Sequence, residues 1–286
     1  MKTLNTIKAM REALSPYRQA NKRIALVPTM GNLHAGHLSL VEEALKQADI
    51  VVTTIFVNPM QFGVNEDLDS YPRTLDADKQ KLASAGNHFL LTPSVTEVYP
   101  NGMNQTTVHV PGCTECLCGE KRPGHFDGVS TVVTKLFNMI QPDVAVFGKK
   151  DYQQLTTIRK MVVDLCFPIE IIGVETGREA DDLAMSSRNG YLSGPERTKA
   201  PALYQALNQV RSTLLAGETS YSKMLNTAQQ SLDEAGFIAD YLEIRDADTL
   251  ETVSKNSARL VILGAAFMGK TRLIDNLTVE LNLSKV

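Results

Sequence analysis

The sequence predicts an α/β protein in which a doubly wound, Rossmann-like parallel sheet is followed by a smaller α+β unit. Short apolar runs alternate with helical patterns as far as about residue 175, and polar motifs follow three of these runs. After about residue 176, two long helical patterns precede three strand-like runs. Strands that alternate with helices are typical of a parallel sheet covered on both faces, whereas helices followed by strands indicate an antiparallel α+β unit.

The first unit contains five expected strands and four expected helices. The strands are nearly continuous apolar runs, as in parallel strands buried on both faces, and they cover residues 23–27, 49–57, 88–92, 143–147 and 169–174. The helices between them cover residues 36–48, 74–85, 128–140 and 151–164.

The second unit is expected to contain two helices followed by three strands. The helices cover residues 195–216 and 219–235, and the strands cover residues 240–245, 258–264 and 272–281. A chain of 286 residues is long enough for two domains, because single cores stop growing at about 250–300 residues. We therefore expect domains at residues 1–176 and 177–286, joined by a short hinge near Glu175.

The bulk composition is that of an ordinary globular enzyme, with 43% hydrophobic and 21% charged residues. A net charge of −3 provides no electrostatic footprint for nucleic acid or an anionic membrane. No apolar run approaches the roughly 18–20 residues that span a bilayer, and the first residues lack the apolar core of a signal peptide. We expect a cytoplasmic enzyme with no nucleic-acid or membrane partner.

The cysteines include a C-x-x-C-x-C cluster formed by Cys113, Cys116 and Cys118. His109 or His125 could supply a fourth metal ligand, but the second C-x-x-C of a strong zinc motif is missing. We expect a surface loop with reduced thiols and no metal site. Cys166 lies in an apolar stretch and is expected to pack as a small hydrophobe.

The most informative motif runs from Pro28 to His37 and reads Pro-Thr-Met-Gly-Asn-Leu-His-Ala-Gly-His. It follows an apolar run and precedes a helical pattern, so unpaired backbone N–H groups and the helix dipole favour an anion there. His34 and His37 are three residues apart and share one face of the first helical turn. Two imidazole donors suit the charge that builds on phosphate oxygens during nucleotidyl transfer. The alternative is a pair of surface or capping histidines.

Two further polar motifs follow expected strands, at residues 58–63 and 148–151. In doubly wound sheets, ligands bind beyond the carboxyl ends of the strands. We therefore expect these motifs and the histidine motif to converge on one crevice. Taken singly, Lys150 and Arg188 would be solvated charges, Gln61 and Gln154 indifferent polar residues, and the serines at 186–187 an ordinary turn.

Six motifs together carry a resemblance to a known family: Pro28 to His37, Ile55 to Gly63, Tyr71 to Asp78, Phe147 to Leu155, Met185 to Asn189 and Thr271 to Asn276. His-x-Gly-His alone would admit the wider nucleotidyltransferase superfamily. From about residue 20 to residue 281 the chain resembles the pantothenate synthetase (pantoate–β-alanine ligase) family. The resemblance implies that ATP adenylates the pantoate carboxylate with release of pyrophosphate, and that the β-alanine amine then displaces AMP to give pantothenate. It also implies ATP as a substrate, Mg²⁺ bound with ATP, and a homodimer.

The resemblance assigns catalytic roles to six residues. His34 and His37 would stabilise the α-phosphate and the leaving pyrophosphate, with His37 as the proton donor, and Lys150 would neutralise phosphate charge. A loop formed by Ser186, Ser187 and Arg188 would close over the β- and γ-phosphates.

The resemblance also implies two binding sets. The ATP-binding residues would be Met30, Gly31, Asn32, Leu33, His34, Ala35, Gly36, His37, Gly148, Lys149, Lys150, Asp151, Gly177, Met185, Ser186, Ser187 and Arg188. For pantoate and β-alanine, Gln61 and Gln154 would form neutral hydrogen bonds to hydroxyls and carboxylate. The same site would include Asn58 and an apolar surface formed by Met30, Phe56 and Phe62.

The chain departs from the family pattern at three positions. Gly177 replaces a residue that is usually Val, which would loosen the hinge. Asp182 replaces a Gly, which would strain the backbone if that position needs a positive φ. Lys149 stands where Glu is commoner and is expected to add positive charge beside the phosphates.

Two other classes of function remain open from the residues. A nucleotidyltransferase that makes dinucleotide cofactors would share the His34/His37 turn but would have no reason to pair Gln61 with Gln154. A non-catalytic binding module would need neither both histidines nor the loop at residues 186–188.

Overall fold

The computed structural model describes residues 1–63 and 66–281, and its larger sheet is wholly parallel. The strand order is β1-β4-β3-β2-β5-β6. These strands are β1 (Lys2–Leu4), β2 (Ile24–Thr29), β3 (Ile50–Ile55), β4 (Phe89–Leu91), β5 (Val144–Gly148) and β6 (Glu170–Val174). The chain moves outward from β2 through β3 to β4 and then returns to the other side of β2 at β5, so the doubly wound sheet is confirmed.

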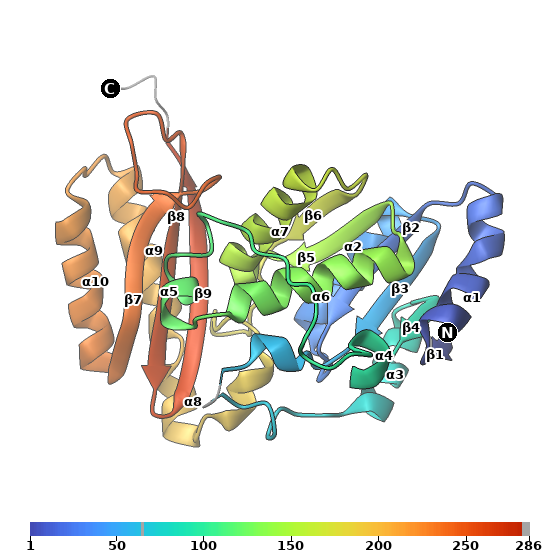
Figure 1. Cartoon of the computed structure of the whole chain (residues 1–286). Coiled ribbons are helices and arrows are strands. Elements are labelled where there is room, and N and C mark those ends of the chain that lie inside the picture. Colours follow the sequence, from blue (N-terminus) through green and yellow to red (C-terminus); the bar gives the residue numbers. More distant parts are fainter. Residues whose placement is uncertain (64–65, 282–286) are drawn as a thin grey trace.

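Helices cover both faces of this sheet (Figure 1). Alternate residues of β2 enter different cores: Ile24 and Leu26 join the core with helices α1, α6 and α7, whereas Ala25 and Val27 join the core with α2. The helices of this part are α1 (Ile7–Gln19), α2 (Ala35–Gln47), α3 (Leu75–Ser84), α4 (Val95–Val98), α5 (Cys118–Lys121), α6 (His125–Ile140) and α7 (Tyr152–Asp164). Two short 3₁₀ turns, η1 (Pro59–Gln61) and η2 (Lys149–Asp151), follow strands β3 and β5.

The sequence did not predict β1 and α1. Thr6 caps α1 through its side chain, which accepts a hydrogen bond from the backbone N–H of Ala9 at 3.2 Å. Met10 and Leu14, one helical turn apart, are buried. A capping residue followed by this spacing was the signal that could have predicted the helix.

The second part of the chain is an α+β unit with an antiparallel sheet ordered β7-β8-β9. It contains η3 (Ser187–Tyr191), α8 (Gly194–Lys199), α9 (Ala202–Leu215), α10 (Tyr221–Ala235), β7 (Phe237–Asp246), β8 (Arg259–Met268) and β9 (Thr271–Glu280). The prediction of one helix over 195–216 was wrong. The chain turns at Ala200 and Pro201 and so divides this segment into α8 and α9, because a proline inside a helix removes a backbone donor.

The antiparallel sheet is covered on both faces. Leu260 and Ile262 of β8 pack with α9 and α10, whereas Val261 and Leu263 belong to the same core as α6 and α7. Figure 1 accordingly shows β7, β8 and β9 between α9 and α10 on one side and the parallel-sheet part on the other. The face of the β7–β9 sheet that lies opposite α9 and α10 therefore packs against the parallel-sheet part.

The cysteine expectations were wrong in two respects. Cys113 and Cys118 are buried in the main core and do not lie on a surface loop, because segment 110–118 packs under the β7–β9 sheet and against α7. Cys166 is exposed in the turn after α7, so it does not pack as a small hydrophobe. Over residues 1–63 and 66–281, no group of three or more His, Cys, Asp or Glu side chains is arranged to hold a metal ion. Within the same residues, no helix is long and apolar enough to cross a membrane.

Candidate active site

The site lies at the carboxyl ends of three neighbouring strands. The histidine motif follows β2, the segment Asn58–Gly63 follows β3, and Gly148–Asp151 follows β5, and these strands are adjacent in the order β3-β2-β5. Parallel strands point their carboxyl ends at one edge of the sheet, and β2–β5 is the point where the strand order reverses. The structure therefore brings three motifs that are far apart in sequence to one place.

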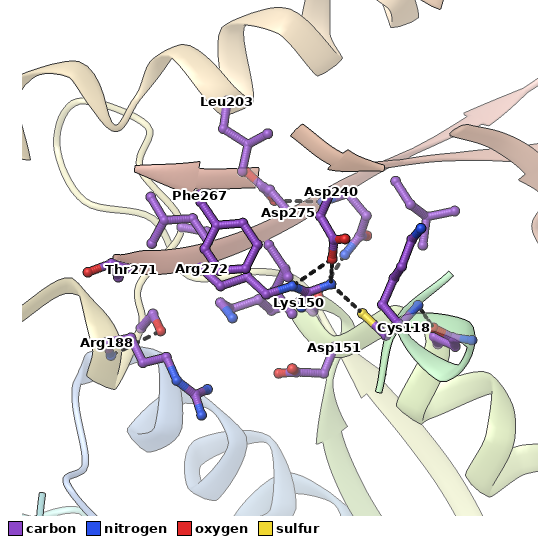
Figure 2. A pocket seen from close by; sticks show the side chains of 18 of the residues that line it. Cys118, Lys150, Asp151, Arg188, Leu203, Asp240, Phe267, Thr271, Arg272 and Asp275 are labelled. Carbon is purple, nitrogen blue, oxygen red and sulfur yellow. Dashed lines mark hydrogen bonds and ion pairs between the residues drawn. The ribbon is translucent and has the colours of Figure 1, made fainter. Parts of the chain in front are cut away.

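Two adjoining cavities occupy this edge. One, of about 240 Å³, lies over the strand ends, and the other, of about 460 Å³, extends toward the β7–β9 sheet (Figure 2). They form one cleft, because seven residues line both: Arg122, His125, Lys150, Asp151, Gln154, Ser186 and Arg188. The expected residues that line the smaller cavity are Met30, His34, Gly36, His37, Phe56, Asn58, Gln61, Phe62, Gly148, Lys150, Asp151, Gln154, Gly177, Met185, Ser186, Ser187 and Arg188.

Five expected ATP-binding residues do not line either cavity: Gly31, Asn32, Leu33, Ala35 and Lys149. The first three form the turn beneath the histidines. Gly31 and Asn32 both have positive φ angles of 87° and 50°, a conformation that favours glycine and tolerates asparagine. The Leu33 side chain is buried in the core beside α2.

Asp78 fixes this turn from below. Its buried carboxylate accepts hydrogen bonds from the backbone N–H of Asn32 at 2.9 Å and of Leu33 at 2.8 Å, and from the hydroxyl of Thr74 at 3.2 Å. Lys81, one helical turn further along α3, donates to the carbonyl of Leu33 at 2.6 Å. Neither residue is among the predicted site residues, although Asp78 ends one of the six motifs that carry the family resemblance.

His34 and His37 lie together at the start of α2, with ring centroids 4.0 Å apart. The backbone N–H of His34 donates to Nδ1 of His37 at 3.3 Å, so a neutral His37 carries its proton on Nε2. Nδ1 of His34 is buried and has no hydrogen-bond partner among the described residues.

Both histidines are held neutral. Burial, followed by the charges of Lys150 and Lys81, lowers the pKa of His34 from 6.5 to about 4. Burial, followed by the neighbouring His34, lowers the pKa of His37 to about 3. At neutral pH the pair can donate hydrogen bonds from uncharged rings, and the proximity of Lys150 supplies the positive charge.

The segment after β3 forms a wall with polar and apolar parts. The Gln61 amide donates to the sulfur of Met30 at 3.1 Å, and its carbonyl oxygen accepts from Asn58 at 3.2 Å. Asn58 is buried and is also held by the hydroxyl of Tyr99 at 2.6 Å and the carbonyl of Gly128 at 3.0 Å. Asn58 thus fixes Gln61 from behind.

η2 presents Lys150 and Asp151 to both cavities. Lys149, which is expected to add charge beside the phosphates, pairs its ammonium with Glu175 and lines neither cavity, so that expectation stays a prediction. Gln154, on the first turn of α7, lies where the two cavities join.

The loop at residues 186–188 also lines the cleft. The Ser187 hydroxyl donates to the carbonyl of Asn32 at 3.1 Å. The Arg188 guanidinium makes two bonds to the carboxylate of Asp67, at 2.8 and 3.1 Å. The loop therefore already contacts the histidine turn, and its cation is held by a carboxylate that sequence analysis missed.

Gly177 and Asp182, two positions that depart from the family pattern, differ in what their backbones require. A Cβ at Gly177 would lie 3.0 Å from Cα of Gly36, so a glycine here permits close approach to the histidine turn. Asp182 has a φ of 70°, so this position does require the positive φ that favours glycine.

Arg122 and His125 are cleft residues that the motif analysis missed. Arg122 pairs with Glu66, and Nδ1 of His125 lies 2.8 Å from the carbonyl of Gln61. Burial, followed by the charge of Arg122, lowers the pKa of His125 to about 4. The basic segment at residues 121–125, just before a helical pattern, was the sequence signal that could have predicted these two cleft residues.

The fold and the site define a nucleotide-binding α/β enzyme, in which uncharged histidine donors, a lysine and a serine–arginine loop face one cleft. The profile of the family described as Pantoate-beta-alanine ligase matches residues 2–278. Because this match covers nearly the whole chain, the chain belongs to the pantoate–β-alanine ligase family. It is a ligase that joins pantoate to β-alanine through an amide bond at the expense of ATP.

Individual relatives agree with this assignment. The chain is 57% identical to the pantothenate synthetase of Pseudomonas savastanoi pv. phaseolicola, over 97% of this chain and 98% of the relative. A crystal structure of pantothenate synthetase from Thermus thermophilus is 46% identical, with a TM-score of 0.91, and the match covers 97% of this chain and 99% of that one. The ligase from Francisella tularensis, solved with a β,γ-ATP compound and β-alanine, is 32% identical with a TM-score of 0.81 over 97% of each chain. These comparisons confirm the resemblance, and neither alternative class of function fits them.

Proposed function

We propose that the cleft carries out both half-reactions of the ligase. The observation that carries the proposal is that the two histidines, Lys150, the two glutamines and the loop at residues 186–188 line one continuous cleft. Pantoate would lie in the smaller cavity, and the ATP phosphates would extend past Lys150 toward Arg188.

In the first half-reaction a pantoate carboxylate oxygen forms a bond to the α-phosphorus of ATP, and the bond from that phosphorus to the bridging oxygen breaks. His37 donates a hydrogen bond from Nε2 to the developing phosphate charge, with His34 beside it. Lys150 and Arg188 balance the charge of the pyrophosphate that leaves. A neutral His37 supports hydrogen-bond donation in the free enzyme, and transfer of a proton would require the negative nucleotide to raise its pKa.

In the second half-reaction the β-alanine amine attacks the acyl carbon of pantoyl adenylate. A C–N bond forms, the bond from carbon to the phosphate oxygen breaks, and the amine loses a proton as AMP leaves. Gln61 and Gln154 hold pantoate through neutral hydrogen bonds, while Met30, Phe56 and Phe62 face its dimethyl group. Asn58 acts by positioning Gln61.

Mg²⁺ would enter with ATP and would help neutralise the phosphate charge beside Lys150 and Arg188. We further propose a homodimer in the cytoplasm, with residues 1–176 binding nucleotide and pantoate and residues 177–286 acting as a lid. These points follow the family resemblance.

The experiment measures pyrophosphate exchange into ATP with and without pantoate, followed by AMP release on addition of β-alanine. We expect exchange only with pantoate, and AMP release in the second step. Exchange without pantoate, or with a mononucleotide in its place, would contradict the proposed pocket and favour a different nucleotidyltransferase reaction.

A further inference from the structure

Two adjacent buried residues of β9, Asp275 and Asn276, connect the small sheet to both sides of the cleft. They belong to the last matched motif, for which no role has been described above. Successive residues of a strand point to opposite faces. Asp275 shares its face with Leu273, which packs with α9 and α10, whereas Asn276 shares its face with Arg272, which contacts Cys118 of the parallel-sheet part.

Asn276 holds the turn that carries Lys150. Its side-chain nitrogen donates to the carbonyl of Lys149 at 2.9 Å and to that of Lys150 at 2.8 Å. An amide nitrogen has two hydrogens, and both are used. The backbone beneath Lys150 is therefore fixed by a side chain 126 residues later in the sequence.

Asp275 holds the segment that leads to the loop at residues 186–188. Its carboxylate accepts two bonds from the Arg178 guanidinium, at 2.7 and 3.0 Å, with side-chain exposures of 3% and 18%. Arg178 also donates to the carbonyl of Asp182 at 3.0 Å and stacks 4.1 Å from the ring centre of Tyr204. The backbones of Arg178 and Ala184 form an isolated antiparallel β-bridge. This β-bridge ends just before the loop at residues 186–188 begins.

The two anchors are joined to each other. The backbone N–H of Asn276 donates to Asp275 at 2.8 Å, so the same carboxylate that holds Arg178 also fixes the backbone of Asn276. Movement of one anchor must therefore disturb the other. Figure 2 shows Lys150 and Arg188 on separate elements that border the cavity below Asp275.

We propose that Asp275 and Asn276 are positioning residues for adenylation, which set Lys150 and the Ser186–Arg188 loop at the distance the triphosphate requires. The proposal rests on the phosphate-binding roles given above. Neither residue needs to touch substrate: Asn276 acts through the Lys150 backbone, and Asp275 acts through Arg178.

The first test is Asn276→Asp, a change of similar size that removes both donated bonds and turns a carboxylate toward two carbonyl oxygens. We expect the rate of pantoate-dependent exchange to fall about 10- to 100-fold, because small misplacements of a catalytic group have effects of this order. Asn226→Asp, the same change on the exposed face of α10, is the matched control and should leave the rate unchanged. Asn276→Ser, which removes the amide without adding charge, replaces Asn276→Asp if that variant does not fold.

A double-mutant cycle with Lys150→Ala distinguishes positioning from general support of the fold. If Asn276 acts through Lys150, Asn276→Asp should slow a Lys150→Ala enzyme less than about threefold. An equal fold-loss in both backgrounds, or no loss in either, would overturn the inference alone. If Lys150→Ala itself left the exchange rate unchanged, the proposed role of Lys150 would be wrong, and the inference would be wrong with it.

The second test separates the two anchors by their kinetic effects. Asp275→Asn removes the carboxylate charge that pairs with Arg178. Because Arg178 supports the segment that leads to the loop at residues 186–188, we expect mainly a higher KM for ATP. Asn276→Asp should mainly lower kcat. Equal changes in both parameters for both variants, accompanied by the same loss of melting temperature, would indicate a structural role only and would overturn the proposal.

Discussion

The backbone N–H of His34 donates to Nδ1 of His37, which leaves the Nε2 proton of His37 free for the cleft. This bond determines the tautomer of the ring, because only one nitrogen of a neutral imidazole carries a proton. It also explains the spacing of His37 from residue 34: the first turn of α2 brings the His37 ring back toward the backbone of residue 34.

Removal of the His37 ring should therefore affect catalysis more than folding. For His37→Ala we expect adenylation to slow about 10²–10³-fold, the typical effect of losing one oxyanion donor, with little change in melting temperature. His109→Ala, an exposed histidine outside both cavities, is the control. A His37→Ala enzyme that forms adenylate within a few-fold of the original rate would show that the ring is not a transition-state donor.

The lowered pKa values also predict how stability depends on pH. His34, His37 and His125 have folded pKa values of about 4, 3 and 4, below the ordinary value of 6.5. As pH falls below about 6.5, the unfolded chain takes up protons that the folded chain excludes, so the free energy of unfolding should fall until the folded pKa values are reached. At neutral pH and above, these rings are neutral in both states and the effect disappears.

Urea unfolding at about pH 7.5, 6 and 5 measures this dependence. His37→Asn should lose less stability than the original protein between the first and last of these pH values, because it lacks one group with a lowered pKa. An identical loss in both proteins would mean that His37 is protonated normally in the fold.

Gln154 lies where the two cavities join, so its substitution tests which ligand it contacts. Gln154→Glu would place a negative charge near the pantoate carboxylate, and we expect repulsion to slow adenylation strongly while ATP affinity stays nearly the same. Gln209→Glu, exposed on α9, is the matched control. Titration with ATP and then with pantoate provides the measurement. If ATP affinity collapses while pantoate binding persists, Gln154 belongs to the nucleotide site.

Asp67 pairs with Arg188, so in the proposed function it would compete with the ATP phosphates for this arginine. Although burial raises its pKa, the hydrogen bond and charge of Arg188 hold the pKa of Asp67 below the ordinary value, so it remains a carboxylate. Asp67→Asn removes that charge from the phosphate path, and we expect ATP to bind about three- to tenfold more tightly. Asp69→Asn, at a nearby exposed position, should have no effect. Calorimetric titration measures both, and weaker ATP binding by Asp67→Asn would show that the pair instead organises the site.

Asp78 should be important for stability as well as for the site. Asp78→Asn replaces one acceptor oxygen by a donor beneath two backbone N–H groups, and we expect a loss of about 2–4 kcal/mol in the free energy of unfolding. Asp76→Asn is a matched control in the first turn of the same helix, where the side chain is 94% exposed. Thermal or urea unfolding measures both, and equal stability of the two variants would contradict the role given to Asp78.

Much of the parallel sheet could be predicted because its signals are local. β2, β3 and β5 are apolar runs followed directly by polar motifs, so the sequence indicates both the strand and the end at which the ligand binds. The break at Pro201 also had a local signal, since proline disfavours a helix interior, but the long periodic pattern on either side obscured it.

The residues of the histidine motif were thus determined by the sequence alone, because strand-turn-helix chemistry depends on neighbours within about ten residues. The family was also determined by the sequence alone, through six short motifs between Pro28 and Asn276. The long-range partners of Leu33, Lys150 and Arg188 depended on the tertiary structure. Asp78 beneath Leu33, Asp67 against Arg188, and Asn276 beneath Lys150 are joined across 45, 121 and 126 residues. No local pattern specifies such pairs, since each exists only after separate elements pack and buried polar groups find their hydrogen bonds.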